Sequence, residues 1–339
     1  MNSGVVSSKP KKVLDGVYQL KLPLPSSELV YLLSYLVEGR DGYLLVDSGW
    51  NTTESFCSLE EQLSRINVNL SDISLVLVTH LHPDHYGLAD RIRKESGSKV
   101  LMHQKTEEIL KHFKNIKNYF DKMIEWLKIN GSPAGELEDW IKASIHLARL
   151  FKPARADIFL QDGEIINLGD FQFDVIWVPG HSPDHICLYE SSRKILLSGD
   201  HILPTITPNV SLQIEDFGNP LKDYLESLKK LCNLKVKKVL PAHEYIFENL
   251  EKRISEIEEH HKKRLEEVLN TINTPKTAYQ IAQEIIWTTG PWNNLQKWEQ
   301  RAAIFEALAH LVFLKYEGRI LEIKQNQTIF FQKISRNSH

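Results

Sequence analysis

The feature that most constrains this chain is a dense group of potential metal ligands placed directly after an apolar β-type run. The run at residues 73–79 is followed at once by His80, His82, Asp84 and His85. Alternate residues of a strand point to the same side, so His80 and His82 share one side of the strand end. The proline between them and Asp84 ends the strand and turns the chain, so that Asp84 and His85 can face the same point. Imidazoles joined by a carboxylate favour a hydrolytic metal site over a structural zinc site closed by thiolates.

Three more ligand candidates stand just past other apolar runs. His181, Asp200 and His243 each follow such a run through a glycine, or through a proline and an alanine. Loops at strand ends are held in place by the sheet and often carry function. Each residue alone is a weak signal, because Gly-His and Gly-Asp turns are common. Together with the first group they predict one metal centre.

Short β-type runs recur through the first two-thirds of the chain and alternate with helical patterns. Many of the runs are rich in Val, Ile, Leu and Tyr and end at Gly, Pro or Asp. The helical patterns cover residues 54–66 and 221–231. The expected strands cover residues 17–24, 29–37, 43–46, 73–79, 99–102, 171–178, 185–189, 194–198 and 237–240. This mixture predicts a layered α/β domain.

Two segments depart from this pattern. Residues 105–150 are rich in Lys, Glu, Trp and Leu and break at Gly131-Ser132-Pro133, so we expect an inserted helical pair. After residue 250 the chain reads as three helices followed by two short strands, the order of a winged helix. Those elements are expected at residues 251–270, 277–286, 299–316, 319–323 and 328–332. We therefore expect two domains, at residues 1–250 and 251–339.

The composition excludes few functions but sets the compartment. A formal net charge of −3 gives no global attraction to nucleic acid or to an acidic membrane. Three scattered cysteines form no disulfide framework and fit a reducing compartment. The chain lacks a signal-like start and an apolar run of about 18 residues, so we expect a cytoplasmic protein with no membrane partner.

These ligand motifs resemble the metallo-β-lactamase superfamily over about the first 250 residues. The resemblance implies a four-layer αββα sandwich with two metal ions at one sheet edge, expected to be zinc, with iron and manganese as alternatives. By position, the first metal would be held by His80, His82 and His181, the second by Asp84, His85 and His243, and both by Asp200. Asp47 matches a family aspartate that supports the site through hydrogen bonds.

Departures from some branches of the family narrow the resemblance. True β-lactamases of similar fold have Cys or Ser where this chain has Asp200, and the oxygen-reducing di-iron branch has Glu in place of His82. The large RNA-processing branch inserts a domain before its last histidine, for which Asp200 and His243 are too close. The C-terminal part resembles a winged-helix appendage found in one subset. That subset and its neighbours include thioesterase-like, lactone- or ester-cleaving and single-strand ribonuclease activities.

Three functions follow from this. The first is hydrolysis of a small-molecule ester, thioester or lactone by a metal-bound hydroxide, with Asp84 carrying the proton toward the leaving group. The second is a single-strand endoribonuclease or phosphodiesterase that grips nucleic acid with the winged helix. The third is a non-catalytic winged-helix regulator, which seven ligands disfavour because a structural zinc needs four. Residues 251–339 hold thirteen Lys and Arg against eleven Glu, too balanced for a phosphate-tracking surface. The first function is therefore favoured over nucleic-acid binding, and a homodimer is compatible with it.

The other histidines are not expected to bind metal. His201 follows Asp200 and is interpreted as a loop histidine, while His185 opens an expected strand and His310 lies on an apolar helix face. Tyr86, beside a ligand, is equally compatible with a hydrogen bond to substrate and with packing.

Overall fold

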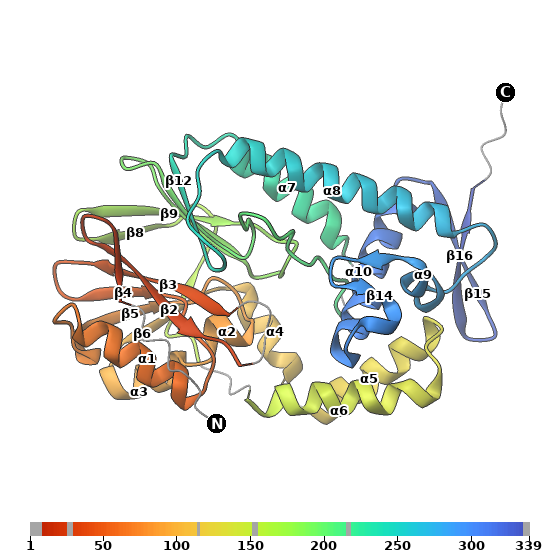
Figure 1. The fold of residues 1–339 in the computed structure, drawn as a ribbon, viewed down its shortest axis with the longest axis horizontal. Coiled ribbons are helices and arrows are strands. Elements are labelled where there is room, and N and C mark those ends of the chain that lie inside the picture. The colour runs from red at the N-terminus through yellow and green to blue at the C-terminus, as the bar shows by residue number, and fades with distance from the viewer. Residues whose placement is uncertain (1–8, 26–29, 114–115, 151–154, 215–217, 335–339) are drawn as a thin grey trace. The chain divides into compact units, whose positions relative to one another are not determined.

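The chain forms two compact units (Figure 1). The computed structural model describes residues 9–25, 30–113, 116–150, 155–214 and 218–334. The first unit comprises Met1–Leu110, Leu150–Pro208 and Ser227–Ile254, and the second comprises Lys111–Arg149, Asn209–Glu226 and Ser255–His339.

Two β-sheets make up most of the first unit. The larger has seven strands in chain order: β1 Lys11–Leu14, β2 Val17–Pro23, β3 Tyr31–Glu38, β4 Tyr43–Val46, β5 Ile73–Leu77, β6 Lys99–His103 and β7 Ile158–Leu160. It is antiparallel from β1 to β4 and parallel from β4 to β7. The smaller sheet has the order β12-β11-β10-β9-β8, from β8 Ile165–Leu168, β9 Phe171–Trp177, β10 Ile186–Glu190, β11 Ile195–Gly199 and β12 Lys238–Pro241. Its β11–β12 pair is parallel, and its other pairs are antiparallel.

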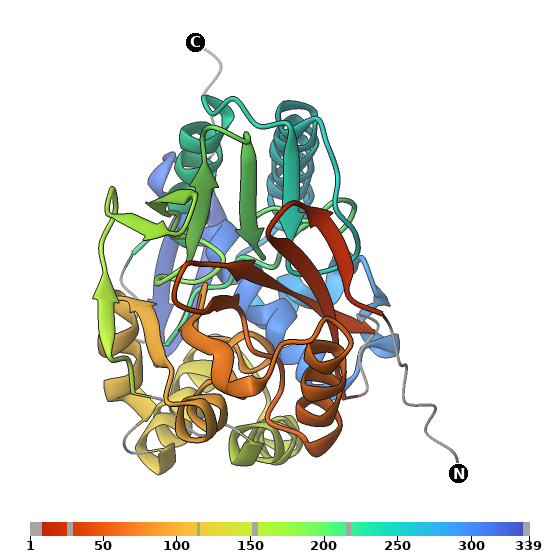
Figure 2. The same ribbon diagram turned by 90° about the vertical axis from the view of Figure 1, so that its left-hand side faces the viewer.

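The two sheets pack face to face around one apolar core. Val17 and Leu44 of the larger sheet belong to the same buried cluster as Phe173 and Leu197 of the smaller. Helices α1 (Thr53–Ser64) and α3 (Ala89–Ser96) cover the outer face of the larger sheet (Figure 2). On the smaller sheet's side, Ser227 in the second half of α7 (Pro220–Cys232) donates to the carbonyl of Pro179 at 2.9 Å. This arrangement confirms the expected α/β fold class.

Local chemistry fixes the ends of the helices on the larger sheet. The Thr52 side chain accepts a hydrogen bond from the Ser55 N–H and so caps the start of α1. Gly97 ends α3 with φ +78°, a left-handed conformation that suits glycine. A 3₁₀ turn, Leu70–Asp72, leads into β5, and the short helix α2 (Pro83–Tyr86) follows it.

The second unit is mainly helical. It contains α5 Ile116–Ile129, all but the last residue of α6 Ala134–Leu150, and most of α8 Leu250–Thr271, whose first turn belongs to the first unit. Its other elements are α9 Ala278–Glu284, the strand pair β13 Ile286–Trp287 and β14 Gly290–Pro291, a 3₁₀ turn Trp292–Asn294, α10 Lys297–Tyr316, and the hairpin β15 Ile320–Gln325 and β16 Thr328–Lys333. Trp140 joins the two sequence segments, because its indole Nε1 donates to Gln300 Oε1 at 3.2 Å and its ring contacts Tyr279 and Trp292. Within the described parts of the chain, no helix has the length and apolarity needed to cross a bilayer.

Some elements differ from the sequence expectation. Residues 105–150 form three helices instead of a pair, because α4 (Lys105–Phe113) precedes α5 and α6. α4 ends at Phe113 and α5 begins at Ile116, and the residues between them are outside the described ones. The expected break near Gly131 is present, with φ +93°. The sequence did not predict strands β1, β7 and β8, which are all short. At least half of the residues in each are exposed, and the other residues of β1 are only partly buried, so no apolar run marks these strands. Three helices and a hairpin follow residue 250 in the expected order, and their likeness to a winged helix stays a prediction.

Candidate metal centre

All seven ligand candidates lie just past the ends of strands in the first unit. His80 and His82 follow β5, and α2 carries Asp84 and His85. The other three follow the smaller sheet's strands: His181 after β9, Asp200 after β11 and His243 after β12. The two sheets thus contribute side chains to the same place from opposite sides.

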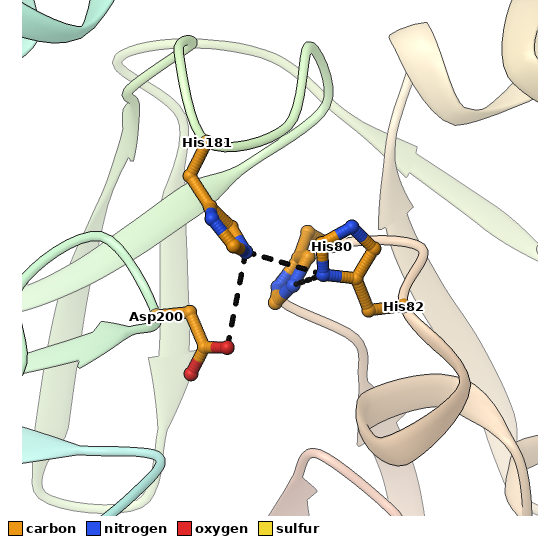
Figure 3. Close-up of side chains that lie close together, drawn as sticks. All are labelled: His80, His82, His181 and Asp200. Atoms are coloured by element: carbon orange, nitrogen blue, oxygen red, sulfur yellow. Dashed lines mark hydrogen bonds and ion pairs between the residues drawn. The ribbon is translucent and has the colours of Figure 1, made fainter. Parts of the chain in front are cut away.

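One group combines three imidazoles and a carboxylate (Figure 3). The ligand atoms of His80, His82, His181 and Asp200 all lie within 4.8 Å of one another. His82 Nδ1 is 2.9 Å from His80 Nε2 and 3.1 Å from His181 Nε2. Three ring nitrogens therefore converge on one small space, as the imidazole ligands of a single metal ion do.

A second group lies beside the first and shares Asp200 with it. Asp84, His85 and His243 also place their ligand atoms within 4.8 Å of one another. Asp200 Oδ2 is 3.8 Å from His181 Nε2 in the first group and 3.3 Å from His85 Nε2 in the second. Its other oxygen, Oδ1, is 3.3 Å from His243 Nε2. Asp200 therefore lies close to ring nitrogens of both groups, and its role as a bridge between two metals stays a prediction.

The outward-facing ring nitrogens are held by a network behind the centre. Asp47 accepts hydrogen bonds from His85 Nδ1 at 2.8 Å and from the Thr79 N–H at 2.8 Å. His80 Nδ1 lies 3.1 Å from Thr79 Oγ1, and His243 Nδ1 lies 3.0 Å from the carbonyl oxygen of Tyr31. Such partners orient an imidazole and fix which nitrogen faces a metal. Asp47 occupies the supporting position that the sequence indicated.

The electrostatics differ between the two groups. Burial, reinforced by the neighbouring His181, lowers the pKa of His82 to about 3 and keeps its ring neutral. Burial also acts to lower the pKa of His243, but Asp200 and Asp84 outweigh it and raise that pKa to about 10. The pKa of His85 is likewise raised, chiefly by Asp200 against the effect of burial. A divalent cation would replace the protons on these two rings, since only neutral imidazole coordinates a metal.

The buried atoms of the centre fit a divalent metal. His85 Nε2, His243 Nε2 and Asp200 Oδ1 are fully buried and, among the described residues, form no hydrogen bond of good geometry. Leaving such an atom unsatisfied costs about 1–3 kcal/mol, and here three of them face the same space. The donor set is nitrogen and oxygen without sulfur, as in catalytic sites for zinc and related ions.

The histidines expected to be non-ligands lie outside both groups. His185 is fully buried, stacks on His80 with centroids 4.7 Å apart, and accepts a hydrogen bond from the Asp200 N–H at 3.1 Å. His201 is fully buried, with its ring centroid 5.6 Å from that of His185. His310 lies in the second unit. Tyr86 is fully buried, which favours packing over contact with substrate.

Two features of the centre were missed from the sequence. The Thr79 hydroxyl, which lies 3.0 Å from Asp47 Oδ2 and 3.1 Å from His80 Nδ1, left no sequence signal beyond its place at a strand end. Asp184 is buried between the loops that carry ligands, and here a signal existed. The triplet Pro-Asp-His occurs both at residues 83–85 and at residues 183–185, directly after a ligand histidine or one residue beyond it.

Comparison with known proteins agrees with this geometry. The family model of the metallo-β-lactamase superfamily matches residues 30–243, a span that contains all seven ligand candidates and ends on His243. The chain is 28% identical over 331 residues to the probable metallo-hydrolase YqjP of Bacillus subtilis (strain 168), covering 95% of this chain and 99% of that protein.

Two further matches, to a relative and to a solved structure, cover different shares of the chain. The bovine acyl-coenzyme A thioesterase MBLAC2 is 29% identical over 221 residues, which cover 62% of this chain and 71% of that protein. A crystal structure of a metallo-β-lactamase family protein from Thermus thermophilus superposes with a TM-score of 0.81 at 27% identity, covering 95% of this chain and all of that one. Fold, ligand arrangement and family match agree, so the chain belongs to the metallo-β-lactamase superfamily and is a metal-dependent hydrolase of that superfamily.

Proposed function

We propose that this hydrolase holds two zinc ions and cleaves a small-molecule ester, thioester or lactone. The observation that carries the proposal is the position of Asp200. Its two carboxylate oxygens face ring nitrogens of both ligand groups, at 3.3 Å from His85 and His243 and 3.8 Å from His181. A carboxylate placed between two groups of imidazoles can contact two neighbouring dications and offset part of their charge.

The two ions would take separate ligands apart from Asp200. One would be held by His80, His82 and His181, and the other by Asp84, His85 and His243. When bound, such a pair supplies a water whose pKa falls from about 15.7 to near 7 and polarises the carbonyl to be attacked. Nitrogen and oxygen donors favour zinc, and iron and manganese are the alternatives that the ligand set also accepts.

Asp84 is the side chain best placed to move a proton. Its side chain is 19% exposed, whereas that of its neighbour His243 is 1% exposed. Burial acts to raise the pKa of Asp84, but the charges of His85 and His243 outweigh it, and the resulting pKa is about 2. An ionised carboxylate at the open side of the centre can accept the proton from the attacking water and deliver it to the leaving oxygen or sulfur.

The substrate class rests on two supports. The bovine relative is named as an acyl-coenzyme A thioesterase, which favours a thioester among the three substrate types. The charge of residues 251–339 is nearly balanced, whereas a surface that tracks phosphates is normally strongly basic. A small-molecule acyl substrate fits both observations better than RNA does.

A substrate panel on metal-loaded protein tests the proposal. The panel contains acyl thioesters, lactones, simple esters, a phosphodiester and single-stranded RNA. We expect turnover of at least one acyl substrate, abolished in His82→Ala and kept in Asp162→Asn, which alters an ion pair with Lys230 on the surface. Cleavage of RNA with no turnover of any acyl substrate would contradict the proposal and favour the nuclease.

Binding of nucleic acid gives a second check. Purified protein should bind single-stranded RNA no more tightly than non-specific proteins do, roughly 10⁻⁴ to 10⁻⁶ M at physiological salt. Submicromolar binding with a steep salt dependence would count against a small-molecule substrate.

A further inference from the structure

Asp184 is a buried carboxylate that the proposed chemistry does not use. It lies between His181 and His185 and is 1% exposed. It belongs to neither ligand group of the metal centre. Burial raises the pKa of Asp184 even though several donors oppose that effect, so the fold keeps an acid where it is costly to ionise.

Its hydrogen bonds come from three separate segments. Thr106 at the start of α4 donates its hydroxyl to Asp184 Oδ2 at 2.8 Å, and Ser182 donates its hydroxyl to Oδ1. The backbone N–H of Leu81 also donates to this carboxylate. Thr106 and Ser182 are themselves buried, at 2% and 6% exposure. A carboxylate is suited to this place because it accepts several hydrogen bonds and donates none.

The position of these donors relates Asp184 to one half of the metal centre. Leu81 lies between His80 and His82, and Ser182 directly follows His181. Those three histidines form the first ligand group, whose members come from loops on different sheets. One backbone bond also joins the loops, from the Ile186 N–H to the Thr79 carbonyl at 2.9 Å. Asp184 adds a side-chain link between the same loops.

We propose that Asp184 is a positioning residue that holds the loop of His181 against the loop of His80 and His82, and so sets the metal affinity of the three-histidine group alone. The inference rests on the proposed metal centre. Its counterpart in the second group is Asp47, which accepts a hydrogen bond directly from His85 Nδ1 at 2.8 Å. Asp47 orients a ligand ring, whereas Asp184 orients the backbone segments that carry three rings.

Titration of metal-free protein with Co²⁺ tests this, because its visible absorption reports the ligands around each ion. Reference variants His82→Ala and His243→Ala give the spectrum of each group when the other is damaged. In Asp184→Ala we expect the three-histidine group to bind Co²⁺ about 10 to 100 times more weakly, the range typical for outer partners of metal ligands. The affinity of the Asp84, His85 and His243 group should stay within about twofold of wild type, since none of the donors above reaches it.

Two further variants separate positioning from general stability. Asp184→Asn keeps one acceptor oxygen and should restore most of the lost affinity. Thr106→Val removes one donor from outside both ligand loops and should weaken the same group by a smaller factor. Asp47→Asn is the matched control and should weaken the second group more than the first, because Asp47 contacts His85 directly but reaches His80 only through the Thr79 hydroxyl.

The outcomes are distinguishable. If Asp184→Ala lowers thermal stability but binds both Co²⁺ ions with wild-type affinity, Asp184 is only structural and the inference is wrong. Equal weakening of both groups would also overturn it. If wild-type protein shows no two distinct Co²⁺ sites, the proposed dinuclear function itself fails, independently of Asp184.

Discussion

Among the described residues, buried histidines cluster in both units of the protein, but only the cluster in the first unit combines enough ligands for a metal centre. In the first unit, ring nitrogens face two carboxylates, and three buried atoms of these side chains form no hydrogen bond of good geometry with the described residues. In the second unit, His261 Nδ1 lies 3.3 Å from His310 Nε2, and His310 Nδ1 donates to the Glu306 carbonyl at 2.8 Å. No third ligand joins this pair among the described residues.

The difference shows that carboxylates, and not histidine density, make the site. Neutral tautomers account for the contacts from His261 to His310 and from His310 to the Glu306 carbonyl, and they leave His261 Nε2 buried without a partner among the described residues. Burial lowers the pKa of both rings, to about 4 for His310. In the metal centre, Asp200 and Asp84 raise the pKa of His85 and His243 instead. Burial keeps the His261–His310 pair neutral, whereas rings held charged by shared carboxylates can exchange their protons for a cation.

The largest effect is expected from the shared carboxylate. Asp200→Asn keeps the size of the side chain but removes the charge that two dications require. Turnover should fall by more than the roughly 100-fold typical of changes to outer partners, and one ion should bind more weakly. Steady-state kinetics and metal analysis measure both. The double variant His261→Gln/His310→Gln should leave turnover and metal content unchanged. Near-normal activity of Asp200→Asn would show that Asp200 does not bridge.

The next largest effect is expected on thermal stability when the metal is removed. At ion concentrations near 100 times Kd, each ion stabilises the fold by about 3 kcal/mol, so chelation should lower the melting temperature by an amount on the order of 10 °C. Calorimetry with and without chelator checks this. The His261→Gln/His310→Gln variant should show the same shift. A shift that disappeared with the His261–His310 pair would place the metal in the second unit and break the comparison.

The His261–His310 pair should make the free energy of unfolding depend on pH. The folded-state pKa of His310 is about 4, below its ordinary value of 6.5, so the stability it contributes is complete above pH 6.5 and is lost as pH falls below that value. Between pH 7 and pH 5 the loss from His310 is about 2 kcal/mol. Denaturant unfolding of metal-free protein should show this extra loss in wild type and not in His310→Gln. His260→Gln, which changes the half-buried neighbour of His261, is the matched control.

The smallest effect on turnover is expected at His185, which lies next to the ligand groups of the metal centre. His185 Nε2 accepts the Asp200 N–H, and a Cβ on Gly199 would come within 2.8 Å of its ring. His185→Phe keeps a ring but removes the acceptor, so turnover should drop by up to about tenfold, near the low end for outer partners, with both ions still bound. Loss of a whole ion in this variant would make His185 part of the ligand set.

The sequence predicted the central strands and the strand-end ligand candidates, but it did not predict the exposed edge strands. Apolar runs of Val, Ile and Leu located the central strands, and strand ends located His80, His181, Asp200 and His243. The exposed edge strands β7 and β8 gave no such signal, because half or more of their residues face solvent. Local sequence marked His185 as a non-ligand because it opens an expected strand, but it gave no role to Asp184 in the second Pro-Asp-His triplet.

The fate of those triplets depends on contacts distant in the chain. At residues 83–85 both the acid and the histidine turn into the metal centre, because Asp47 holds His85 from behind across 38 positions. At residues 183–185 the acid turns to Leu81 and to Thr106, 78 positions away, and the histidine stacks on His80. Identical local sequences therefore acquire different roles through tertiary partners, which spacing alone does not reveal.

The central claim is that the two ligand groups hold one ion each and share Asp200. Elemental analysis of wild-type protein, combined with anomalous diffraction at the zinc edge, tests it most directly. We expect close to two ions per chain, one against His80, His82 and His181 and one against Asp84, His85 and His243, with Asp200 touching both. A reproducible single ion, with His85 and His243 turned away from it, would contradict the account.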